Sequence, residues 1–152
     1  KRNKMIDFNK QLKKEVILNA TVAEVWKKWT TTEGITSFFA PQAEIELAIG
    51  GKFELYFMLD NTSGEQGSED CKILSFLPEK MLSFSWNAPP QFPTVRKQKH
   101  WYVLEFIELT KNQTQLILTG LGWQHSAEWN EVYNYFDRAW EMVLNNLKNS
   151  LE

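Results

Sequence analysis

One long amphipathic segment near the C-terminus constrains the fold more than any other feature of the sequence. From Ser126 to Leu151, apolar side chains recur every three or four residues, which is the spacing of one face of an α-helix. These apolar residues are Trp129, Val132, Tyr133, Phe136, Trp140, Val143, Leu144, Leu147 and Leu151. Ser126 is a suitable N-cap, and such a helix spans about 40 Å. Its apolar face requires a large apolar partner, which points to a sheet.

The central part of the chain predicts that sheet. Between Ala43 and Trp123, short runs of alternating apolar and polar residues are separated by turn residues such as Gly50 and Gly51. This pattern predicts about six consecutive strands, most simply in an antiparallel meander. The residues expected on its buried face are Phe53, Leu55, Phe57, Leu82, Phe84, Trp86, Tyr102, Leu104, Phe106, Leu116 and Leu118.

The N-terminal part predicts a strand followed by two short helices. Residues 16–19 have the alternation of a strand, and Thr21 with Glu24 forms a capping box at the start of the first helix. A second short helix must end before Pro41. We therefore predict an α+β fold in which an antiparallel sheet of six to seven strands wraps around the C-terminal helix. Residues 1–12 are predicted to form an N-terminal arm, and residues 13–150 the folded domain.

Length and charge restrict the classes of function. A chain of 152 residues suits one domain with a substantial core, and its net charge of −2, without a long Lys/Arg run, does not favour nucleic acid or an anionic membrane surface. No apolar run approaches the ~18 residues that would cross a bilayer. We expect a cytoplasmic protein. Because the sequence begins at Lys1, an exported mature form is the alternative.

The reactive side chains do not form a recognisable catalytic or metal-binding motif. Cys71 is the only cysteine, which excludes an internal disulfide, and we expect it to be an inert, partly buried thiol. His100 and His125 lie on different predicted elements without a third ligand nearby. Glu105 has the opposite strand parity to its apolar neighbours and should face solvent. No catalytic residue, metal site or cofactor is therefore predicted.

Three blocks of the sequence, in this order, resemble a known family: "ATVAEVWKKWTTTEGITSFFAP", "AEIELAIGGKFELYF" and "GW…EWNEVYNYFDRAWEMVLNNLK". They are similar to the activator of Hsp90 ATPase homologue family in its short, single-domain bacterial form, which has the helix-grip fold of the START-like (SRPBCC) superfamily. The similarity extends from about Lys13 to Lys148. It implies a cavity between the curved sheet and the C-terminal helix, used in the superfamily for lipids, polyketides, hormones and other apolar molecules.

We expect Tyr133 and Phe136, in the middle of the long helix, to face this cavity, while Trp129, Trp140 and Leu147 belong to the core. The predicted cavity residues on the sheet are Phe53, Leu55, Phe57, Phe84, Trp86, Tyr102, Leu104, Phe106 and Leu118. Bulky residues in predicted connections, namely Phe38, Phe39 and Phe92, are candidates for the cavity mouth. The simpler alternatives are that the helix aromatics are only core and that the loop aromatics are only loop packing.

The predicted function is non-catalytic binding of a hydrophobic small molecule or lipid in this cavity. A protein-interaction module, similar to a co-chaperone, is the alternative. The eukaryotic activators resemble two-domain proteins with a linker, and neither a second domain nor a linker is visible here. A weaker alternative is an enzyme that acts on a cavity-bound hydrophobic substrate. A protein partner remains open, and we expect a monomer or weak dimer.

Overall fold

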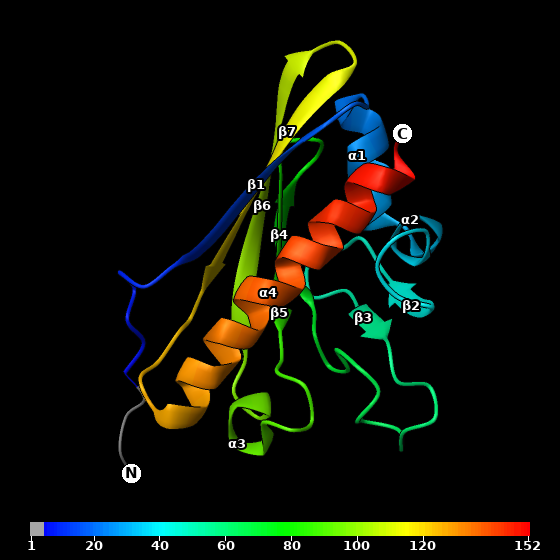
Figure 1. Cartoon of the computed structure of the whole chain (residues 1–152). Helices are drawn as coiled ribbons and strands as arrows, with labels where there is room; N and C mark the ends of the chain where they lie inside the picture. Colours follow the sequence, from blue (N-terminus) through cyan, green and yellow to red (C-terminus); the bar gives the residue numbers. More distant parts are fainter. Residues whose placement is uncertain (1–4) are drawn as a thin grey trace.

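The structure is a computed structural model that describes residues 5–152 (Figure 1). The elements are β1 (Leu12–Leu18), α1 (Val22–Thr30), α2 (Thr32–Thr36), β2 (Gln42–Ile45), β3 (Phe53–Tyr56), β4 (Ile73–Leu77), β5 (Met81–Trp86), α3 (Pro93–Arg96), β6 (His100–Thr110), β7 (Gln113–Leu121) and α4 (Ala127–Ser150). This order confirms the α+β prediction, with two short helices after the first strand and one long C-terminal helix. The short helix α3 lies in the proline-rich stretch for which the sequence predicts only a loop.

The strands form two sheets instead of one continuous sheet. Five strands pair antiparallel in the order β1-β7-β6-β5-β4, and β2 pairs separately with β3. The two sheets are connected by isolated bridges, Lys52 with Lys72 and Tyr56 with Gly67, and by single backbone hydrogen bonds such as Phe53 N–H to the Cys71 carbonyl at 3.0 Å. Within the segment after β3, the backbone N–H groups of Gly64, Gln66 and Gly67 donate to the Glu69 carboxylate and not to a neighbouring strand.

Helix α4 crosses one face of the five-stranded sheet (Figure 1). Its N-cap is Ser126, whose hydroxyl accepts a hydrogen bond from the Trp129 N–H at 3.0 Å. Its buried residues are Trp129, Val132, Phe136, Trp140, Leu144 and Leu147. At the edge of the same sheet, the Lys14 ammonium of β1 lies 2.9 Å from the Asp137 carboxylate and 2.8 Å from that of Glu141. The predicted capping box of Thr21 and Glu24 is also present at the start of α1.

The predicted inner face of the sheet is buried with one exception. Phe57 is 38% exposed, because β3 ends at Tyr56 and the alternation of the strand does not extend to the next residue. Glu105 faces solvent as its parity predicts, whereas Cys71 is fully buried and not partly buried. Strand parity therefore predicts the core well wherever the strand persists.

The predicted N-terminal arm, residues 1–12, includes four residues that lie outside the described part of the chain. Within the rest, the Asp7 N–H donates to the Trp123 carbonyl at 2.9 Å, and the Asp7 carboxylate lies 2.8 Å from His125 Nε2. These contacts place the segment before β1 against the β7–α4 connection. Within residues 5–152, no helix combines the length and the apolar character needed to cross a membrane.

Candidate functional site

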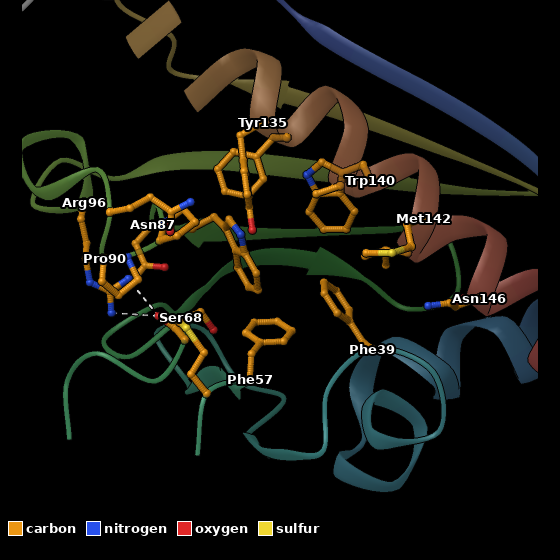
Figure 2. Close-up of a pocket in the computed structure, with 18 residues that line it drawn as sticks. Phe39, Phe57, Ser68, Asn87, Pro90, Arg96, Tyr135, Trp140, Met142 and Asn146 are labelled. Carbon is orange, nitrogen blue, oxygen red and sulfur yellow. Dashed lines mark hydrogen bonds between the residues drawn. The ribbon is translucent and has the colours of Figure 1, made fainter. Parts of the chain in front are cut away.

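A pocket of about 300 Å³ opens between α4 and the loops that follow β3 and β5 (Figure 2). Its lining residues come from segments that are far apart in the sequence: Phe39, Phe57, Met58, Gly67, Ser68, Trp86, Asn87, Pro89, Pro90, Gln91, Arg96, Tyr135, Phe136, Ala139, Trp140, Met142, Val143 and Asn146. Aromatic and aliphatic side chains form one end, and the polar side chains of Ser68, Asn87 and Arg96 lie together at the other.

Helix α4 supplies one wall of the pocket through a second stripe of residues beside its core stripe. These residues, Tyr135, Ala139, Met142, Val143 and Asn146, follow one another at helical spacing. Phe136 and Trp140, which belong to the core stripe, also reach the pocket. The helix therefore packs against the sheet with one face and borders the pocket with the adjacent face.

Four aromatic side chains form the apolar end. Phe39 follows α2 and contacts the other three, with centroid distances of 5.8 Å to Phe57, 5.9 Å to Trp86 and 5.5 Å to Trp140. Trp86 and Trp140 are themselves 6.2 Å apart. Offset and edge-on ring contacts in this range are favourable, so the wall has a defined shape. A planar apolar ligand in this pocket would contact the faces and edges of these rings on several sides.

The polar end is built around Arg96, whose side chain is only 14% exposed. Its Nη1 donates to the Ala88 carbonyl at 2.6 Å, and its Nη2 donates to the Gly64 and Gly67 carbonyls at 2.7 and 3.1 Å. Nη2 also lies 3.3 Å from the Glu69 carboxylate. Arg96 thus joins α3 to the loop after β3 and fixes this end of the pocket.

Glu69 organises the same loop from behind the pocket. Its carboxylate accepts hydrogen bonds of 2.8 to 2.9 Å from the backbone N–H groups of Gly64, Gln66 and Gly67. Burial on its own raises the pKa of Glu69, but the backbone hydrogen bonds from Gln66, Gly67, Glu69 itself and Gly64 together outweigh it, so the pKa lies below its usual value. The carboxylate is therefore charged near neutral pH and balances Arg96.

A buried polar pair lies behind the pocket wall. His100 Nε2 is 2.9 Å from the Tyr102 hydroxyl, and both residues are fully buried. Burial lowers the pKa of His100 to about 3 and raises that of Tyr102. Phe136 packs 5.2 Å from the imidazole and lines the pocket, whereas His100 does not line it. Among residues 5–152, no group of three His, Cys, Asp or Glu side chains could hold a metal ion.

The predicted cavity residues divide into two groups. Phe57, Trp86 and Phe136 line the pocket. The others on the sheet are buried in the core and do not line it: Phe53, Leu55, Phe84, Tyr102, Leu104, Phe106 and Leu118. Of the predicted mouth residues, Phe39 lines the pocket, Phe38 is buried 5.2 Å from Trp29, and Phe92 supports Tyr135 at 5.9 Å. The structure thus brings together four of the residues proposed from the sequence.

Tyr133 lies outside the pocket. Its hydroxyl donates to the Gln11 carbonyl at 2.8 Å, and its ring packs 4.9 Å from Trp123. Successive helical residues are rotated by roughly 100°, so Tyr133 and Tyr135 lie on opposite sides of Phe136. The pocket opens on the Tyr135 side. Spacing alone placed Tyr133 beside Phe136, but it could not distinguish the two sides.

Sequence reasoning missed Tyr135, Asn87 and Arg96. The stripe that contains Tyr135, Ala139 and Met142 has helical spacing and was a usable signal. No comparable signal marks Asn87 or Arg96, because both lie in the proline-rich connection between β5 and β6. Their role in the pocket depends on how that connection folds against Gly67 and Glu69.

Several solved structures share this fold. Protein MLL2253 from Mesorhizobium loti superposes with a TM-score of 0.74 and 18% identity, covering 93% of this chain and 96% of that chain. The Aha1 dimer from Colwellia psychrerythraea superposes with a TM-score of 0.69 and 17% identity, covering 94% of this chain and 96% of that chain. CalU16 from Micromonospora echinospora superposes with a TM-score of 0.68 and 23% identity, covering 93% of this chain and 76% of that chain. At these identities the likeness shows the fold alone.

The sequence comparisons identify the family. A search among curated proteins finds no match. The sequence profile described as "Activator of Hsp90 ATPase homolog 1-like protein" matches residues 19–152, which include every strand and helix of the structure after β1. The chain therefore belongs to the activator of Hsp90 ATPase homolog 1-like family.

Proposed function

We propose that the protein binds a compact apolar small molecule, without catalysis, in the pocket between α4 and the loops after β3 and β5. The observation that supports this proposal is the aromatic wall formed by Phe39, Phe57, Trp86 and Trp140 around about 300 Å³. This volume is at the lower end of the range of small-molecule sites, about 300 to 1,000 Å³, which favours a ligand of two or three rings over a long-chain lipid.

A non-catalytic role fits the titratable groups around the pocket. Arg96 is the one charged residue among the lining residues, and its guanidinium is held by internal partners. The nearest buried histidine, His100, is behind Phe136, and its lowered pKa of about 3 makes it a weak base. The Tyr135 phenol also lines the pocket, but no His, Asp, Glu, Lys or Cys side chain is among the lining residues to act with it as a general base or nucleophile.

A protein-interaction module is the second candidate, because apolar side chains are exposed beside the pocket. Phe57 is 38%, Met58 37%, Leu59 41% and Met142 63% exposed. Grouped exposed apolar side chains of this kind are typical of partner sites. The two functions differ in where the apolar contact is made, inside the pocket or around its rim.

A substitution that fills the pocket distinguishes small-molecule binding from a protein-interaction role. We expect a neutral, environment-sensitive naphthalene dye to bind with about micromolar affinity. Ala139→Trp should abolish binding, because Ala139 lines the pocket and the indole would occupy it. Ala127→Trp is the matched control, since Ala127 is an exposed residue of the same helix away from the pocket. Fluorescence titration measures both.

Unchanged dye binding by folded Ala139→Trp would contradict this site. If the folded, monodisperse wild-type protein binds no neutral aromatic dye at all, the small-molecule proposal fails and the interaction module replaces it.

A further inference from the structure

The side-chain amide of Asn87 has only one orientation that suits its surroundings. Its Nδ2 lies 3.2 Å from the Gly67 carbonyl oxygen and 3.5 Å from that of Glu69. Both partners can only accept a hydrogen bond, so the nitrogen must face them. The amide oxygen then points away from them, into the pocket (Figure 2). Asn87 is only 7% exposed, and none of residues 5–152 donates a hydrogen bond to its Oδ1.

Tyr135 places a second unpaired polar atom in the pocket. Its ring is held by Phe92 at 5.9 Å and Phe136 at 5.1 Å, and its hydroxyl points from α4 toward the pocket interior (Figure 2). That oxygen has no hydrogen-bond partner within the described part of the chain. A phenol can donate or accept, whereas the Asn87 oxygen can only accept. A ligand that displaces solvent from Asn87 Oδ1 therefore has to present a donor to it.

Arg96 does not provide a free positive charge for an anionic ligand. Its Nη1 and Nη2 donate to three backbone carbonyls, and its charge is balanced by Glu69 at 3.3 Å. No other lysine, arginine or histidine lines the pocket. Moving a carboxylate from water into an apolar site without a free cation is strongly unfavourable. The polar end of the pocket therefore suits a neutral group better than an acid.

From this juxtaposition of an unpaired acceptor and a neutralised cation, we propose that the pocket selects neutral aromatic ligands that carry a hydroxyl or another hydrogen-bond donor, and rejects aromatic carboxylates. The donor binds Asn87 Oδ1, and the rings lie against Phe39, Trp86 and Trp140. The Tyr135 hydroxyl is available for a second polar atom. This inference rests on the proposed small-molecule function and specifies its ligand class.

Four matched probes test it at pH 7: naphthalene, 2-naphthol, 2-methoxynaphthalene and 2-naphthoate. The naphthol is neutral and can donate, the methyl ether can only accept, and the naphthoate is an anion. We expect the naphthol to bind at least about tenfold more tightly than the naphthoate and roughly fivefold more tightly than the ether, because only the naphthol satisfies Asn87 without burying a charge. Titration calorimetry measures all four affinities.

A substitution of Asn87 tests whether this residue causes the preference for the naphthol over the ether. Asn87→Ala should reduce the naphthol-to-ether affinity ratio to about one, because the acceptor is removed. Asn145→Ala, on the exposed side of α4, is the matched control and should keep the wild-type ratio. Because Asn87 also supports the Gly67 loop, NMR of the wild-type protein provides a second readout. The side-chain amide signal of Asn87 should shift with the naphthol more than with the ether.

The outcomes separate this inference from the function on which it rests. If naphthalene binds but the naphthoate or the ether binds as tightly as the naphthol, the ligand class is wrong and the pocket function stands. A preference that persists in folded Asn87→Ala also overturns the role of Asn87. If none of the four probes binds to the folded protein, both proposals fail.

Discussion

His100 is a histidine in surroundings that suit only its neutral form. Its ring contacts Trp123, Trp129 and Phe136, and its single hydrogen bond is to Tyr102. Its Nδ1 has no partner among the described residues. A protonated imidazole would be a buried charge without a counterion. The charge state of this one residue therefore couples the stability of the fold to pH.

We expect the free energy of unfolding to fall as the pH is lowered from 6.5 toward 3. The unfolded chain binds a proton at His100 near its ordinary pKa of 6.5, whereas burial lowers the folded-state pKa to about 3. Protons therefore favour the unfolded state throughout that window, by about 2 kcal/mol at pH 5. Urea unfolding at several pH values measures the effect, with His100→Gln as the non-titrating control. Equal slopes for both proteins between pH 6.5 and 5 would show that His100 is not the cause.

At the scale of the element, α4 serves two functions with adjacent faces. Its core face packs on the five-stranded sheet, and the face that carries Tyr135, Ala139 and Met142 borders the pocket. Phe136 belongs to both, since it is 5% exposed, lines the pocket, and contacts His100 and Tyr102. A substitution of Phe136 should therefore affect both stability and ligand binding, whereas a substitution of Met142 should affect ligand binding with little effect on stability.

Two alanine substitutions on α4 should show this division. Phe136→Ala should lower the free energy of unfolding by about 3 to 5 kcal/mol, because it leaves a cavity in the aromatic core. Met142→Ala should lower it by less than about 1 kcal/mol, because Met142 is 63% exposed. Both should change the affinity for a naphthalene probe. A small loss of stability for Phe136→Ala would mean that its ring is only a pocket wall and not close-packed core.

At the scale of the whole molecule, the pocket exists because four distant segments meet, the first of them being the turn after α2 with Phe39. The loop after β3 supplies Gly67 and Ser68, the connection after β5 supplies Asn87 and Arg96, and α4 covers them. Glu69 does not line the pocket, yet it fixes the loop after β3 and the connection after β5 relative to each other through backbone hydrogen bonds and Arg96. Ligand binding should therefore depend on a residue that the ligand does not touch.

Glu69→Gln tests this dependence. We expect it to lower the free energy of unfolding by about 1 to 2 kcal/mol and to weaken naphthol binding several-fold, because Arg96 loses its counterion and the loop loses part of its support. Glu65→Gln is the matched control, since Glu65 is exposed in the same loop. Chemical denaturation and calorimetry measure the two effects. Wild-type affinity in Glu69→Gln would show that the loop keeps its shape without the carboxylate.

Local features of the sequence determined the elements and the core. The capping box at Thr21, the N-cap at Ser126 and the apolar period of α4 depend on neighbours within a few residues, so they are visible in the sequence and present in the structure. Strand parity likewise predicted the apolar buried residues of the sheet except Phe57, which lies beyond the end of β3, but it did not predict that Ser83 of β5 is buried as well.

Only the tertiary structure decided where space remains between those elements. Periodicity defines an apolar face, but it does not show which edge of that face meets a neighbour, so it favoured Tyr133 when Tyr135 borders the pocket. The division into two sheets has no counterpart in the local sequence pattern, and Asn87 and Arg96 are held by hydrogen bonds to Gly67 and Glu69, more than fifteen residues away in the chain. A pocket is the volume that distant segments fail to fill, and no local pattern in the sequence encodes that volume.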